Sequence, residues 1–209
     1  MKKFVCSLLI AAGAAFAQYK TEPAGAAPAE LAPAVAAVLQ QPGTKILNAG
    51  GAVVCEVWVR TTIPSGPKST EANVSFPTVP HGALLGAIRF PAAGSDRRGQ
   101  SLKPGVYTMR YSIYPVDGSH QGVAPQRDFL LLVPAADDKD PASLPTYEQV
   151  VDMSRKASGT PHPAVLSIEP PAGDAPNPGF IKEGENDWVL NTKIGSMPVG
   201  IILIGKYEG

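Results

Sequence analysis

The sequence predicts a mainly β protein, an antiparallel β-sandwich with one or two short helices. Short apolar segments that alternate with polar residues recur along the chain, which is typical of half-buried strands. The chain also contains 22 prolines and 21 glycines, and these divide it into short elements joined by turns. An α/β fold would require repeated helices between the strands, and the sequence does not show them.

Residues 1–17 have the three parts of a cleavable secretory signal peptide. Two lysines follow Met1, Phe4–Phe16 is apolar or small apart from one serine, and Ala15-Phe16-Ala17 forms a small-residue cleavage site. The apolar run is too short to span a bilayer, and an N-terminal membrane anchor is the alternative interpretation. We therefore expect an exported protein, periplasmic or extracellular. Because no second long apolar segment follows, we expect the mature form to be soluble and to have no membrane span.

The mature chain divides into a leader and one compact domain. Residues 18–42 are rich in Ala and Pro. Gln18–Pro33 has the composition of a disordered segment, and Ala34–Gln41 can form a short helix that docks on the domain. Residues 43–209 form the predicted sandwich domain, which is long enough to bury a core without a disulfide.

The predicted strands of this domain are separated by turn signals. Asn48-Ala-Gly-Gly51 separates the first two, and Pro104-Gly105 precedes the clearest one. The one clear internal helix is Tyr147–Lys156, which Thr146 can cap. The expected strands cover Lys45–Leu47, Ala52–Arg60, a stretch around Asn73–Phe76, Leu84–Phe90, Val106–Tyr114, Asp128–Val133, Val165–Ile168, Trp188–Thr192 and Val199–Tyr207.

The last strand is apolar on both faces, which predicts a central position covered on both sides, with the internal helix as one cover. If Ile201–Ile204 lay at a sheet edge instead, this segment could serve as an assembly interface.

Charge and cysteine content exclude several classes of function. Without residues 1–17 the chain has 16 basic and 18 acidic residues and no basic block, which argues against nucleic acid as a partner. Cys55 is then the only cysteine, so an internal disulfide and a cysteine-based zinc cluster are excluded. We expect Cys55 to be buried and inert beside Val57, and Trp58 on the opposite strand face to pack rather than to form a ligand platform.

The segment Leu102-Lys-Pro-Gly-Val-Tyr-Thr-Met109 resembles a turn and strand of secreted bacterial β-sandwich domains. Many immunoglobulin-like and transthyretin-like modules contain a similar Leu-x-Pro-Gly-x-Tyr run. Asp117–Val133 and Met153–Ser167 resemble stretches of uncharacterised secreted bacterial proteins. The resemblance implies an immunoglobulin-like or transthyretin-like sandwich, and it implies no activity, cofactor or site residue.

Only fragments of catalytic motifs occur in the sequence. Ser65-Gly-Pro-Lys68 fits the S-x-x-K pattern of penicillin-binding enzymes, and Lys193-Ile-Gly195 is close to K-T-G. The serine of that pattern must open a helix, which Gly66 and Pro67 oppose. We therefore interpret the match as a coincidence.

Five polar residues in or beside loops are candidates for a ligand site: Asp117, His120, Gln121, Arg127 and His162. Loops on a rigid β scaffold are where binding groups concentrate. Asp117, His120 and His162 could together bind a divalent metal, because two imidazoles and a carboxylate suit a transition metal. The structural alternatives are a turn for Asp117, a local ion pair for Arg127, and surface or turn positions for the histidines.

The leading hypothesis for function is a non-enzymatic binding or interaction module, without a cofactor, for an unknown small molecule or protein. The first alternative is a metal-binding protein or enzyme that uses His120, His162 and Asp117. The second is a structural or assembly subunit. Because fold alone cannot separate these classes, the distance between His120 and His162 is the informative observation.

Overall fold

The computed structural model describes residues 19–115, 127–173 and 178–206 of the chain. In this part of the chain, ten antiparallel strands form one sheet, and a two-stranded ladder and two short helices accompany it. The ten strands are β1 (Lys20–Gly25), β2 (Gly43–Leu47), β3 (Val53–Val59), β4 (Leu84–Phe90), β7 (Gly105–Ile113), β8 (Asp128–Pro134), β9 (Val165–Glu169), β10 (Gly179–Glu183), β11 (Asp187–Ile194) and β12 (Met197–Ile204). The ladder consists of β5 (Gly94–Ser95) and β6 (Ser101–Leu102), and the helices are α1 (Pro33–Ala36) and α2 (Tyr147–Ser158). The predicted mainly β class with one or two short helices is confirmed.

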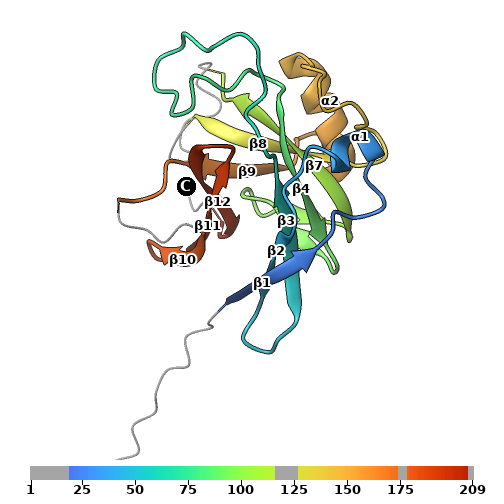
Figure 1. Ribbon diagram of the computed structural model, residues 1–209, viewed down its shortest axis with the longest axis vertical. Coiled ribbons are helices and arrows are strands. Elements are labelled where there is room, and N and C mark those ends of the chain that lie inside the picture. The colour runs from blue at the N-terminus through green and yellow to red at the C-terminus, as the bar shows by residue number, and fades with distance from the viewer. Residues whose placement is uncertain (1–18, 116–126, 174–177, 207–209) are drawn as a thin grey trace, which may run out of the picture.

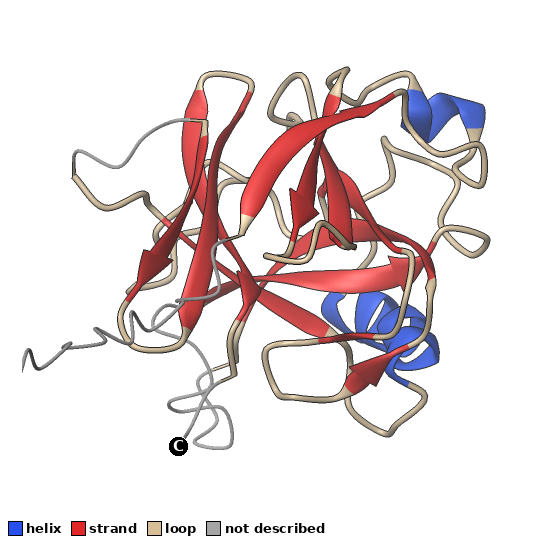
Figure 2. Ribbon diagram, turned by 90° about the horizontal axis from the view of Figure 1, so that it is seen from below, coloured by secondary structure: helices blue, strands red, loops and turns tan. Residues whose placement is uncertain are grey.

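The ten-stranded sheet curls until its two ends approach each other. Its strands are hydrogen-bonded in the order β1-β2-β3-β4-β7-β8-β9-β12-β11-β10, and Figure 2 shows them around a common interior. Where β1 and β10 meet, the ring of Tyr19 packs edge-on against Phe180 and Trp188, with centroids 5.8 and 4.7 Å away. The arrangement is nearly barrel-like, and the predicted two-sheet sandwich of the immunoglobulin-like or transthyretin-like type is not confirmed.

The interior of the curled sheet holds the main hydrophobic core. Side chains alternate between the two faces of a strand, and Tyr107, Met109 and Tyr111 of β7 belong to this interior core. Cys55 and Val57 of β3 belong to it as well, so the predicted burial of Cys55 is confirmed.

The outer face of the sheet is covered in two places. The segment around α1 packs Leu31 and Val35 against Trp58, whose indole Nε1 donates a hydrogen bond to the Gly25 carbonyl at 3.1 Å. The predicted packing role of Trp58 is therefore confirmed. The second cover is α2, whose Val150 packs near β8, and Figure 1 shows both helices on the side away from β10–β12.

The predicted internal helix is confirmed, including its cap. The Thr146 backbone N–H donates to Gln149 Oε1 at 2.9 Å and the Gln149 N–H donates to Thr146 Oγ1 at 3.4 Å, which forms a capping box. The helix ends at Gly159, whose φ of 64° is the left-handed conformation that favours glycine. No helix in the described ranges is long and apolar enough to cross a membrane.

The segment that composition predicts to be disordered forms an ordered strand instead. β1 pairs with β2 from Lys20 opposite Leu47 to Gly25 opposite Gly43, with a register shift after Pro23. The prediction of disorder is wrong for Lys20–Gly25, because the partners that stabilise this strand, β2 and the aromatic rings at the seam, are distant in sequence. Proline is tolerated here because β1 is the first strand in the sheet order. The short helix docks as predicted but is limited to Pro33–Ala36.

β12 is a central strand, as predicted. It lies between β9 and β11, and Ile201 and Ile202 are buried on opposite faces. Because Ile201–Ile204 does not lie at a sheet edge, the condition for the assembly interface is not met. α2 contacts β8 rather than β12, so the expected helical cover of the last strand is wrong. Three smaller differences remain: Asn73–Phe76 forms no strand, and neither β10 nor the β5–β6 ladder was expected.

Candidate functional site

An open cavity of about 690 Å³ lies where four parts of the fold meet. These are the loop at Pro67–Glu71, the turn at His81 before β4, the neighbouring ends of β7 and β8, and the segment that leads into the first turn of α2. Its lining residues are Pro67, Lys68, Ser69, Thr70, Glu71, His81, Ile113, Pro115, Arg127, Leu144, Pro145, Thr146, Tyr147 and Glu148. Proline, leucine and isoleucine side chains form its apolar part, and charged and hydroxyl groups form its polar part.

Arg110 holds the wall of the cavity that precedes α2. Its Nη1 donates to the carbonyl oxygens of Gly82 and Ser143 at 2.6 and 2.8 Å, and its Nη2 donates to that of Asp140 at 2.8 Å. Its Nε and Nη2 also donate to the carboxylate of Asp138. These bonds engage the N–H donors of the Arg110 guanidinium, which is why its positive charge can be fully buried. The loop that carries Leu144 and Pro145 is thereby fixed to the sheet.

Asp128 holds the opposite wall. Its carboxylate accepts hydrogen bonds from the backbone N–H groups of Ser75 at 2.8 Å and Phe76 at 3.1 Å, and from the Tyr111 hydroxyl at 2.6 Å. Burial, together with this hydrogen bond, raises the pKa of Tyr111. A loop with little regular structure is thus tied to β8 by one buried carboxylate.

Arg127 lines the cavity, but its guanidinium already has partners within the protein. Its guanidinium forms an ion pair with Glu71 at 2.5 Å and donates to the carbonyl oxygens of Tyr114 and Ala72. The local ion pair considered for this residue is therefore present. Arg127 positions the loop rather than presenting a free cation to an anionic ligand.

His81 lines the cavity and contacts β7. Its Nε2 is 2.8 Å from Ser112 Oγ, and Ser112 is fully buried. Burial lowers the pKa of His81, and a hydrogen bond with the Pro145 backbone and the charges of Glu148 and Glu71 oppose that shift to a smaller extent. At neutral pH the site therefore presents a neutral imidazole. The buried hydroxyl is inaccessible as a nucleophile, so the Ser–His contact is structural.

The rim of the cavity carries the free charges. Lys68 has no ion-pair partner among the described residues and is exposed. Glu148 is exposed as well, and hydrogen bonds from its own backbone N–H and from Thr146 lower its pKa. A cation and an anion thus stand at the edge of a largely apolar depression.

Leu144 forms a ridge between this cavity and a second depression of about 580 Å³. With 40% of its surface accessible, it is the one large hydrophobic residue of the described segments that is exposed. The second depression is lined by Ser143, Leu144, Pro145, Gln149, Asp152 and Met153. The second depression therefore extends along α2, where Met153 is its apolar residue and Gln149 and Asp152 are polar.

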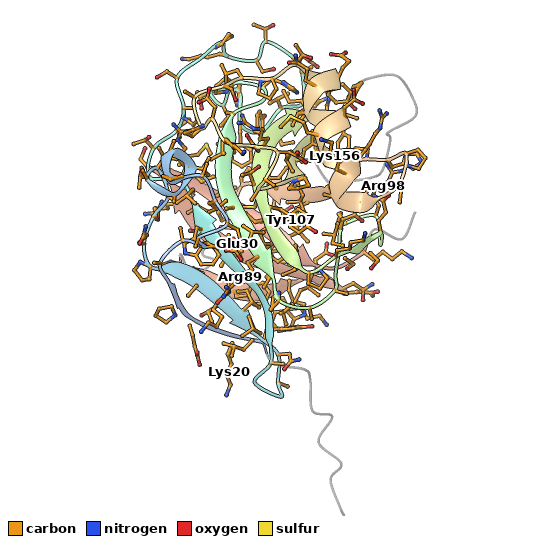
Figure 3. The ribbon with its side chains drawn as sticks, turned by 90° about the vertical axis from the view of Figure 1, so that its right-hand side faces the viewer. Lys20, Glu30, Arg89, Arg98, Tyr107 and Lys156 are labelled. Atoms are coloured by element: carbon orange, nitrogen blue, oxygen red, sulfur yellow. The ribbon has the colours of Figure 1, made fainter. Side chains whose placement is uncertain are left out.

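Of the other residues proposed from the sequence, Asp117, His120 and Gln121 lie outside the described residues, and His162 does not line this cavity. His162 is exposed and follows the last turn of α2, where Lys156 is labelled in Figure 3, whereas the cavity lies at the first turn. Its backbone N–H donates to Thr160 Oγ1 at 3.1 Å, a turn-stabilising position. Within the described ranges, no group of three or more His, Cys, Asp and Glu side chains is arranged to hold a metal ion.

Comparison of the chain with protein-family models, with curated proteins and with solved structures found no match. The function must therefore be argued from the cavity itself.

Two lining residues, His81 and Lys68, are not among the site residues selected from the sequence. His81 stands between Pro80 and Gly82, and a histidine in a tight turn before a buried strand was the available signal. The only sequence pattern that includes Lys68 is the S-x-x-K match. Ser65–Lys68 forms no helix in the structure, which agrees with the interpretation of that pattern as a coincidence.

Proposed function

We propose that the protein is an exported, non-enzymatic binding protein and that the cavity at the first turn of α2 is its site for a small organic ligand. The observation that carries the proposal is the cavity's combination of size and lining. Its volume of about 690 Å³ lies within the range of small-molecule sites, which are mostly apolar with a few placed polar groups.

The rigidity of the walls supports the same proposal. Asp128 and the pair Arg110–Asp138 anchor the two sides of the cavity through buried hydrogen bonds. Walls that are held in advance lower the cost of ordering on binding. The buried state of Ser112 and the use of Arg127 in loop anchoring favour binding over catalysis.

The charges on the lining favour an organic acid with an apolar body. Lys68 is the cation of the described lining that remains unpaired, because Arg127 is engaged with Glu71. A carboxylate near Lys68 would leave the rest of the molecule over Ile113, Leu144 and the neighbouring prolines. The secretory signal peptide expected over residues 1–17 supports a location outside the cytoplasm for such a binding protein.

The test is saturation-transfer NMR with a panel of small aromatic and branched aliphatic carboxylates. We expect at least one member to bind, and Leu144→Asp to weaken it at least tenfold because the new carboxylate lies on the apolar ridge. Ala142→Asp is the matched control, since Ala142 is exposed in the same loop and does not line the cavity. Equal binding by the two variants, or no binding to any panel member, would refute the proposal.

A further inference from the structure

Glu148 is a charge at the rim of the ligand cavity that a simple carboxylate would leave unused. It lies in the first turn of α2, where the Thr146 hydroxyl donates to Glu148 Oε2 at 3.0 Å. A hydrogen bond from its own backbone N–H, together with the one from Thr146, lowers the pKa of Glu148, so the group is ionised at neutral pH. The carboxylate is exposed and keeps free acceptor positions, because an ionised carboxylate has about four of them.

Lys68 carries the opposite charge, and its loop is fixed against the ridge that Leu144 forms. A Cβ on Gly66, two residues before Lys68, would lie 3.1 Å from Leu144 Cδ1, so the two segments are in close contact. On the other side of Lys68, the Ser69 N–H donates to the Pro77 carbonyl at 2.9 Å. The backbone that carries the ammonium group is therefore held beside the apolar ridge.

The start of α2 is held against the same cavity by the turn that precedes β4. The rings of His81 and Tyr147 lie with their centroids 6.2 Å apart. A Cβ on Gly82 would overlap the backbone oxygen of Pro145, so the turn and the approach to the helix are in direct contact. Glu148 follows Tyr147 directly and lines the cavity from this side.

The described lining of the cavity is electrically balanced at neutral pH, where burial keeps His81 uncharged. Its charged residues are two cations, Lys68 and Arg127, and two anions, Glu71 and Glu148. Arg127 and Glu71 pair with each other, which leaves one cation and one anion for a ligand. A simple organic acid satisfies the cation, but the remaining anion repels it. A ligand with both a carboxylate and an ammonium group satisfies both charges.

We propose that the ligand of this cavity is an α-amino acid with an apolar side chain, with its ammonium group at Glu148 and its carboxylate at Lys68. The inference rests on the proposed binding function and narrows the ligand class from organic acids to zwitterions. An α-amino acid carries both charged groups and its side chain on one carbon. This arrangement matches a rim with one cation and one anion beside the apolar wall of Ile113 and Leu144.

NMR titration of the mature protein at neutral pH with matched pairs of ligands tests the proposal. L-leucine is paired with isocaproate and L-phenylalanine with hydrocinnamate, so that the members of a pair differ only in the ammonium group. We expect the amino acid of at least one pair to bind roughly three- to fivefold more tightly than its partner, the contribution of one exposed ion pair. Glu148→Gln should abolish this difference, because its carboxamide can still accept from Thr146 but carries no charge.

Asp152→Asn is the matched control, because Asp152 is an exposed carboxylate about one turn further along α2 that does not line this cavity. It should leave the difference within each pair unchanged. Binding of the simple carboxylates without tighter binding of either amino acid would overturn the proposal and leave organic acids as the ligand class. Equal weakening of both members of a pair by Glu148→Gln would also overturn it. Failure of all these compounds and of the whole carboxylate panel to bind would overturn the proposed function as well.

Discussion

Arg110 and Asp138 form a buried bidentate ion pair, with Arg110 Nε 2.7 Å from Asp138 Oδ2 and Arg110 Nη2 2.7 Å from Asp138 Oδ1. Arg110 belongs to β7, and Asp138 belongs to the loop that follows β8 and leads to α2. The pair joins the sheet to the segment that carries Leu144 and Pro145. The shape of the cavity therefore depends on a charge pair that does not itself line it.

Asp138→Ala should destabilise the protein by about 3–5 kcal/mol, because it leaves the buried Arg110 charge without its partner. The free energy of unfolding from urea titration measures this effect. Asp137→Ala is the control, since Asp137 pairs with Lys156 at 3.4 Å on the surface and such pairs contribute about 0–1 kcal/mol. Similar losses in the two variants would contradict the structural role of Arg110.

The stability of the protein should fall in mildly acidic solution through His81. Burial lowers the pKa of His81 in the folded state, so the unfolded state binds the proton more readily. The stabilisation from neutral His81 is complete above the unfolded pKa of about 6.5 and is lost as pH falls from there toward the lowered folded pKa. We expect His81→Gln to lose less unfolding free energy than the unmodified protein between pH 7.5 and 5.5. Parallel losses would show that His81 is not responsible.

Elements with a strong local signal could be predicted from the sequence, and elements held by distant contacts could not. The alternation of β7 and the Thr146 cap of α2 are encoded within a few residues. β1 contains Pro23 and Gly25, which argue locally against a strand, and it forms because β2 and the rings of Phe180 and Trp188 are available. The formation of one curled sheet, rather than the two sheets of a sandwich, likewise depends on pairings between strands that are distant in sequence.

The residues of the candidate site could not be predicted from the sequence for the same reason. His81, Lys68 and Leu144 come from three separate segments, and no spacing in the sequence relates them. The residues chosen from the sequence instead shared loops rich in polar groups, and of these only Arg127 lines the cavity. Its role as a loop anchor depends on Glu71, which is far away in the chain and could not be paired with it beforehand.

Cys55 should be unreactive in the folded protein. Burial, with a smaller contribution from the charge of Glu56, raises the pKa of its thiol to about 12, so the reactive thiolate is scarce at neutral pH. Labelling with a disulfide reagent should be slow without denaturant and fast in its presence. An Ala142→Cys, Cys55→Ala double variant supplies an exposed thiol as a reference, and native Cys55 labelling at the reference rate would contradict the prediction.

The exported form should begin at Gln18. The Ala15-Phe16-Ala17 site sets this expectation, and Tyr19, the next residue, packs at the seam of the sheet. Expression with the complete leader, followed by intact-mass measurement of the protein from the periplasm or medium, tests the cleavage site. Ala17→Asp should block processing. Recovery of the chain with Met1 intact in the membrane fraction would contradict export by cleavage.

The most direct test of the ligand cavity is a two-dimensional ¹H–¹⁵N NMR titration of the mature protein with the strongest carboxylate from the saturation-transfer panel. We expect saturable shifts that centre on residues 67–71, on His81 and on residues 144–148, with β10 and β11 unaffected. Saturable shifts centred on another part of the chain, with these residues unchanged, would contradict it.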